Sequence, residues 1–201
     1  MEFKMKDDNK LNTRDLITLG IFNAIAIVVY MLVSSLFCIT ILGSLISTAA
    51  VYLVIGVVYL LPAIKIRKRG VFLICGIILA IISLSSGQIY HVISVIIGAV
   101  IAEMLAGDYS TSKKISSAFV ALMTFDFIGI NLPIFAFGPS YILERGARYG
   151  ITEAAINSSL HYFTWSTFII LLVLNIVCAI FGAWIGMKII EKHFKESDLV
   201  E

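Results

Sequence analysis

A stretch of 49 residues without a charged side chain is the feature that most constrains this chain. No Asp, Glu, Lys or Arg occurs from Leu16 to Ile64. As one helix rising 1.5 Å per residue, this stretch would be about 74 Å long, more than twice the hydrocarbon core of a bilayer. It therefore predicts two membrane-spanning helices, over residues 16–36 and 43–64. The polar break between them is marked by Ser34, Ser35, Thr40, Gly43, Ser44, Ser47 and Thr48.

The composition excludes a water-soluble globule. Hydrophobic residues make up 60% of the chain and charged residues 14%, against about 45–50% and 25% in soluble domains. A formal net charge of +2 gives no reason to expect nucleic acid as a partner. The lipid bilayer is the partner that this composition predicts.

Three further apolar regions predict four more spans. Residues 70–102 carry no charge, and an interruption rich in serine and glycine divides them into two short helices. We expect an all-α membrane protein with six transmembrane helices, and residues 138–162 as its long loop. The predicted parts are a cytoplasmic segment over 1–15, a transmembrane domain over 16–187 with helices at 16–36, 43–64, 71–84, 88–105, 115–137 and 163–187, and a cytoplasmic tail over 188–201.

The distribution of basic residues supports six spans. Lys and Arg accumulate in cytoplasmic loops, and six spans place 13 of the 15 basic residues on one side. These are Lys4, Lys6, Lys10, Arg14, Lys65, Arg67, Lys68, Arg69, Lys113, Lys114, Lys188, Lys192 and Lys195. Both termini are therefore expected in the cytoplasm of a cell whose plasma membrane holds the protein. The polar N-terminus, without an obvious cleavage context, predicts that no signal peptide is removed.

The sequence argues against catalysis or ATP hydrolysis by this chain. A P-loop requires a Gly-Lys pair, and the chain has none. The histidines His91, His161 and His193 are scattered and form no His-Glu-x-x-His motif. The first two could approach each other at the outer surface, but an obvious third ligand is lacking. We expect no enzyme activity, no cofactor and no metal centre.

Asp126 is placed near the membrane midplane, about 12 residues into the fifth predicted helix. An unpaired carboxylate is costly at that depth, so we interpret Asp126 as a candidate functional residue. The alternative is a structural carboxyl that is protonated or hydrogen-bonded to Asn23, Thr124 or Asn175. On a regular helix Asp126 and Asn131 are about 140° apart, so both face one pocket only if the helix is distorted.

Polar and aromatic residues gather at the predicted outer ends of the helices. Flat apolar faces with a few polar tips are suited to a small ring-bearing ligand. The predicted substrate-binding residues are Gln88, Tyr90, His91, Asp126, Asn131, Tyr141, Tyr162 and Trp165. An interfacial belt of aromatic side chains is the alternative explanation for part of this set. Arg145 and Arg148 could contact a ligand carboxylate or phosphate, or remain solvated loop charges.

Small residues spaced by four recur on three predicted helices. Such spacing lets helix backbones approach closely within a membrane. The residues are Gly20 and Ala24, then Gly98, Ala102 and Ala106, then Gly182 and Gly186. Packing within the chain is the expected role for most of them.

Three segments carry a resemblance to a known family: residues 10–24, residues 86–103 and the Gly-Ile-Asn-Leu-Pro-Ile run over 129–134. They resemble the Trep_Strep family of integral membrane proteins, which is grouped with the substrate-binding S components of energy-coupling factor (ECF) transporters. The resemblance implies a vitamin-like small molecule captured at the outer face. It also implies docking on a T component that carries two ATPases of the ABC importer class.

The implied docking surface is a stripe of small residues on the first helix. Gly20 and Ala24 match that stripe, and Val28 departs from a longer run of alanines. The sequence also leaves a second function open, in which the chain is a stand-alone proton-coupled transporter that uses Asp126 as its coupling carboxylate.

Overall fold

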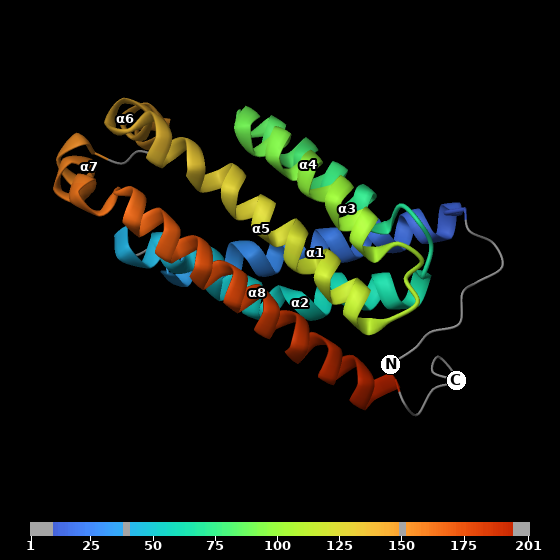
Figure 1. Ribbon diagram of the computed structural model, residues 1–201. Helices are drawn as coiled ribbons and strands as arrows, with labels where there is room; N and C mark the ends of the chain where they lie inside the picture. The colour runs from blue at the N-terminus through green and yellow to red at the C-terminus, as the bar shows by residue number, and fades with distance from the viewer. Residues whose placement is uncertain (1–9, 38–40, 149–151, 195–201) are drawn as a thin grey trace.

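The computed structural model describes residues 10–37, 41–148 and 152–194. These residues form an all-helical bundle without a strand (Figure 1). The long helices are α1 (Thr13–Phe37), α2 (Ile41–Ile66), α3 (Val71–Ser85), α4 (Ile89–Ala106), α5 (Ser112–Phe137) and α8 (Trp165–Phe194). The predicted all-α membrane fold is confirmed, and each predicted span corresponds to one of these helices.

Five of the long helices are long and apolar enough to cross a membrane, and α3 is a shorter apolar helix. Its 15 residues form about 22 Å of helix, less than the thickness of the hydrocarbon core. The outward faces are apolar, as a lipid-facing surface requires. On α1, for example, Ile17, Leu32 and Leu36 are 59%, 62% and 71% exposed.

Local sequence signals explain where several helices begin. Asn12 and Asp15 cap α1 reciprocally, because each side chain accepts a hydrogen bond from the backbone amide of the other. Thr111 caps α5 by accepting from the amide of Lys114. At α3 the preceding residue, Gly70, adopts a φ of 97°, a conformation that glycine enters without steric cost.

The helices pack as a ring in which neighbours in space are often distant in sequence (Figure 1). Helix α2 lies between α1 and α8, α5 lies between α4 and α8, and α3 packs against α4. Several crossings depend on glycine. A Cβ at Gly182 would overlap the backbone oxygen of Tyr52, and a Cβ at Gly98 would overlap the side chain of Phe125. The predicted packing role of these small residues is confirmed at both positions.

One end of the bundle gathers the start of α1, the α2–α3 connection, the α4–α5 connection and the end of α8 (Figure 1). The basic residues predicted on one side of the membrane lie at this end wherever the structure describes them. Lys68 joins two of these parts, since its Nζ lies 2.9 Å from Oδ2 of Asp15 and 3.0 Å from the backbone oxygen of Lys10. It does so while only 5% exposed.

The prediction of a long loop over residues 138–162 is wrong. This region contains the helices α6 (Pro139–Arg148) and α7 (Glu153–Ser159) and the 3₁₀ turn η1 (Leu160–Tyr162). Gly138, with a φ of 69°, ends α5, and Pro139 begins the next helix because its fixed φ suits that position. Likewise, α8 continues to Phe194, beyond the predicted end at residue 187. Charged residues made both helical regions resemble loop or tail.

Candidate functional site

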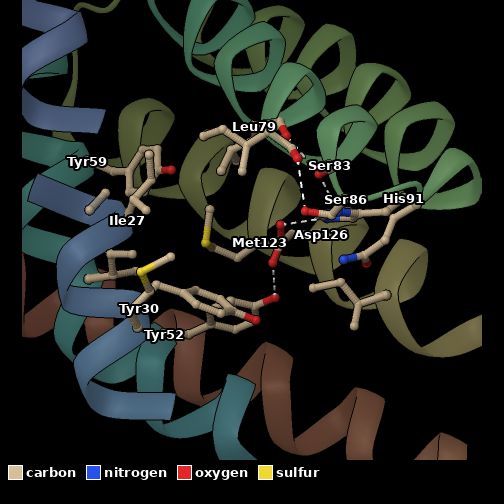
Figure 2. Close-up of a pocket in the computed structure, with 16 residues that line it drawn as sticks. Ile27, Tyr30, Tyr52, Tyr59, Leu79, Ser83, Ser86, His91, Met123 and Asp126 are labelled. Atoms are coloured by element: carbon tan, nitrogen blue, oxygen red, sulfur yellow. Dashed lines mark hydrogen bonds and ion pairs between the residues drawn. The ribbon is translucent and has the colours of Figure 1, made fainter. Parts of the chain in front are cut away.

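A cavity of about 410 Å³ lies between helices α1 to α5 (Figure 2). Its volume is within the range of sites for small organic ligands. Most of its wall is apolar, and its polar groups come from tyrosine, serine, glutamine, histidine and aspartate. The lining residues are Ala26, Ile27, Tyr30, Met31, Tyr52, Ile55, Tyr59, Leu79, Ile82, Ser83, Ser86, Gln88, His91, Met123, Asp126 and Ile130.

His91 and Asp126 form a buried pair at the cavity wall. Nε2 of His91, on α4, lies 2.9 Å from Oδ1 of Asp126, on α5. The two residues are 7% and 5% exposed. Gly129 lies one turn after Asp126, and a Cβ there would be 2.8 Å from the Cα of His91. The missing side chain therefore allows α4 to come close enough for the pair to form.

Two further side chains extend this pair into a four-residue network. Tyr52, on α2, donates its hydroxyl to Oδ2 of Asp126 at 2.7 Å. At the other side, Oγ of Ser83, near the end of α3, lies 2.7 Å from Nδ1 of His91. Figure 2 shows the network crossing from α3 through His91 and Asp126 to Tyr52. It ties together four helices and satisfies both oxygens of a carboxyl that is buried in the bundle.

The residues proposed from sequence as partners of Asp126 bond elsewhere. The side-chain amide of Asn23 donates to the backbone oxygen of Leu19 and to Sγ of Cys75. Thr124 and Asn175 each donate to the backbone oxygen four residues earlier on their own helices. Asp126 is therefore paired, but with the imidazole of His91 and the phenol of Tyr52 rather than with these three side chains.

Three of the predicted substrate-binding residues line the cavity: Gln88, His91 and Asp126. Asn131 is buried without lining it, and its amide donates to the backbone oxygen of Phe127. Helix α5 continues through Pro133 to Phe137, and Asp126 lines the cavity without Asn131. The two residues face different surroundings, as a regular helix requires.

The remaining predicted residues lie apart from the cavity. Tyr90, Tyr141 and Phe137 form an aromatic cluster, with ring centroids 5.1 to 6.4 Å apart. Tyr162 contacts the ring of His161, and Trp165, 56% exposed, packs edge-on against Phe168. A direct role for these side chains in binding stays a prediction. The side chains of Arg145 and Arg148 lie outside the described part of the structure.

Sequence reasoning missed Tyr30, Tyr52, Tyr59 and Ser83 as lining residues. A signal for two of them was present. Tyr52 and Tyr59 stand seven residues apart on a helix without charge before Lys65, and a spacing of seven places two side chains on the same helix face. Two phenol groups on one face of an apolar helix indicate a shared polar environment.

A comparison with protein families places this geometry in context. The model of a family described as "Hypothetical bacterial integral membrane protein (Trep_Strep)" matches residues 13–196. The chain belongs to the Trep_Strep family. No curated protein and no solved structure matches the chain. The matched region of this Trep_Strep protein contains all the long helices and every residue that lines the cavity.

A second polar cluster lies where α4 ends and α3 begins in the Trep_Strep protein. The carboxylate of Glu103 accepts hydrogen bonds from the backbone amides of Gly70 and Leu73 and from the hydroxyl of Tyr109. Burial and the neighbouring Glu103 carboxylate raise the pKa of Tyr109 above its ordinary value. Because Glu103 caps the N-terminus of α3, we interpret this cluster as structural.

Proposed function

We propose that this protein is the substrate-binding S component of an ECF-type ABC importer. In this proposal it lies in the plasma membrane with both termini in the cytoplasm, and it captures a vitamin-like micronutrient at the outer face. The observation that carries the proposal is the cavity of about 410 Å³, which combines apolar walls with one buried polar network. A site of this kind is suited to binding a small molecule with high affinity.

The chain offers binding chemistry but no means of hydrolysing ATP. It lacks the Gly-Lys pair of a P-loop, so transport driven by ATP requires partner subunits. A T component with two ABC ATPases would supply that energy. We propose no enzymatic step for this chain, because Tyr52, Asp126, His91 and Ser83 are hydrogen-bonded to one another in a network that supports binding.

The exposed stripe on α1 supports docking on such a partner. Gly20 and Ala24 are both exposed, and a Cβ added at Gly20 would meet no atom within 4 Å. Other glycines of the long helices differ: a Cβ added at Gly56, Gly98 or Gly182 would overlap atoms of the same chain. A stripe of small residues that this fold does not use leaves room for a helix of another subunit.

Proteoliposomes test the proposal. The purified chain alone should bind a small molecule but not accumulate it, with or without a proton gradient. Addition of the T component, the ATPases and ATP should then produce accumulation. Native mass spectrometry of gently purified protein would detect a co-purifying compound. Accumulation by the chain alone would contradict the S-component assignment.

The second candidate function is a stand-alone proton-coupled transporter. The buried His91–Asp126 pair favours it, because two titratable groups 2.9 Å apart can hold and release a proton within the membrane. The same proteoliposomes separate the two functions. Accumulation driven by a proton gradient, and abolished by Asp126→Asn, would support the carrier.

A further inference from the structure

The hydroxyl of Ser83 determines where one proton lies on His91. Oγ of Ser83 lies 2.7 Å from the backbone oxygen of Leu79. Because a carbonyl group has no hydrogen to donate, the single hydroxyl proton of Ser83 lies in that bond. Oγ therefore acts as the acceptor toward Nδ1 of His91, 2.7 Å away. It follows that Nδ1 carries a hydrogen.

A second proton is shared between His91 and Asp126. Tyr52 donates to Oδ2 of Asp126, while Oδ1 faces Nε2 of His91 at 2.9 Å. Two lone pairs would repel each other at that distance, so one of the two atoms carries a hydrogen. The pair is then either imidazolium with carboxylate or imidazole with carboxylic acid. Both forms have a net charge of zero, so the pair is neutral as a unit.

The rest of the cavity adds no charge. Among the described residues, neither Lys nor Arg lines it, and Asp126 is its only acidic group. A ligand carboxylate or phosphate placed there would be buried without an opposite charge, which is strongly unfavourable. A cation would have to displace the proton held by the His91–Asp126 pair. The lining therefore favours an uncharged molecule.

Tyr59 supplies a second polar contact. The residue is 3% exposed and lines the cavity, yet its hydroxyl has no hydrogen-bond partner among the residues that the structure describes. Buried hydroxyls are nearly always paired, so this one is available to a ligand. Tyr59 lies seven residues beyond Tyr52 on α2, about 10 Å along the helix axis. Figure 2 shows it across the cavity from the His91–Asp126 pair.

We propose that the cavity binds an uncharged, ring-bearing molecule that is polar at both ends, with one end against the Tyr52–Asp126–His91 network and the other against the Tyr59 hydroxyl. Neutral heteroaromatic compounds belong to this class, and carboxylates and phosphates do not. The tyrosine rings and the thioethers of Met31 and Met123 are suited to an aromatic body between those ends. This proposal rests on the proposed function, since it names the class of molecule that the S component would capture.

Thiol labelling measures the charge preference of the cavity without a known ligand. The probes are the neutral 2-hydroxyethyl, the anionic 2-sulfonatoethyl and the cationic 2-trimethylammonioethyl methanethiosulfonates. The target is Met123→Cys, a lining position that is 2% exposed, in a full-length chain with Cys38 and Cys178 replaced by serine. The matched control is Ser85→Cys, an exposed position beside the cavity that does not line it.

Rates at Met123→Cys are divided by those at Ser85→Cys for each probe. We expect the normalised rate to be about tenfold lower for both charged probes than for the neutral probe, because each charge must be buried unpaired. A normalised rate for the sulfonate or ammonium probe that equals or exceeds the neutral one would overturn the proposal. The labelling result does not depend on whether the protein takes part in transport.

The second experiment uses a lipid-free extract of cellular metabolites as the probe, with retained masses read by native mass spectrometry. Retention of a neutral ring compound supports the proposal, and retention of an anion overturns it while the proposed function stands. Failure to retain any compound contradicts the proposed function instead. Tyr59→Phe should lower retention of the neutral compound about five- to tenfold, whereas Ser117→Ala, an exposed hydroxyl outside the cavity, should not. Unchanged retention in Tyr59→Phe would overturn the two-ended arrangement.

Discussion

Gly129 of α5 lies directly against His91 of α4. A Cβ at position 129 would come within 2.8 Å of the Cα of His91 and 2.9 Å of its Cδ2. The hydrogen bond between His91 and Asp126 forms beside this contact. The distance between two helix backbones, rather than the reach of either side chain, therefore controls whether the pair exists.

Gly129→Ala should separate the pair. The added methyl group meets backbone, which cannot rotate away, so we expect a loss of about 1–3 kcal/mol in the free energy of unfolding. Thermal unfolding of the purified protein in detergent measures this loss. Gly20→Ala is the matched control, since nothing lies within 4 Å of a Cβ there, and its unfolding temperature should not fall, because alanine favours a helix more than glycine does. An unaltered unfolding temperature in Gly129→Ala would refute the close contact.

His91→Gln and Asp126→Asn should show energetic coupling. Each single variant leaves the other residue without its charged or titratable partner, so the double variant should lose less stability than the sum. We expect a coupling of roughly 0.5–2 kcal/mol, since pairs within membrane bundles fall at the low end of the range for contacting residues. Unfolding of the four proteins in detergent gives this value. A control cycle of Asp126→Asn with Thr124→Val should be additive, because Thr124 bonds to Val120 instead.

Two Asp–Lys pairs at one end of the bundle should respond differently to salt. The side chains of Asp15 and Lys68 are 14% and 6% exposed, against 39% and 45% for Asp108 and Lys114. Asp15→Asn should cost about 1–3 kcal/mol of unfolding free energy at any NaCl concentration from about 0.05 to 0.5 M. The smaller effect of Asp108→Asn should disappear at the high concentration. Equal salt dependence in the two variants would contradict the difference in burial.

The Asp108 pair also has a pH dependence. Hydrogen bonds from Lys114 and then from Ser110 hold the pKa of the Asp108 carboxyl well below its ordinary value. A lowered folded-state pKa means that the stabilisation is present above the ordinary Asp range and is lost as the pH falls through the folded-state value. Between pH 6 and pH 8 the difference between wild type and Asp108→Asn should therefore stay constant.

Leucine at Gly20 and Ala24 should separate docking from ligand binding. Both positions are exposed on α1, so larger side chains fit without disturbing the bundle but fill the stripe proposed for the T component. Uptake and co-purification with the T component should fall, while retention of small molecules by the purified variant should persist. Val173→Leu, on the exposed face of α8, is the matched control. Loss of retention with intact co-purification would contradict the docking role.

Much of the fold follows from the sequence because charge is costly in hydrocarbon. The gap from Leu16 to Ile64 predicts two spans, and the break predicted at 85–87 lies within one residue of the turn at 86–88 that separates α3 from α4 in the structure. Where charges are permitted, outside the membrane, that signal ends. Helices α6 and α7 were therefore missed, since their polar residues are equally suited to a loop or a surface helix.

The candidate site was only partly predictable for a different reason. Asp126 stands out because it is a lone carboxyl at depth, but its partners lie 35 and 74 residues earlier in the chain. Which turn of α4 or α2 faces Asp126 depends on glycine contacts such as that of Gly182 with Tyr52. Such contacts fix the position of one helix along the axis of its neighbour. No periodicity within a single helix specifies that position.

Helix α1 carries two surfaces whose occupants would act on each other. Ile27 and Tyr30 close the cavity, and the exposed Gly20 and Ala24 lie earlier on the same helix, with Gly20 on the same face as Ile27. A partner seated on Gly20 and Ala24 holds or shifts the part of α1 that closes the cavity, so a filled cavity and a docked partner would change each other's affinity by the same factor. The ratio of the affinities for the T component, measured with the cavity filled and with it empty, gives this factor directly. A ratio of one would mean that α1 does not couple the two binding events.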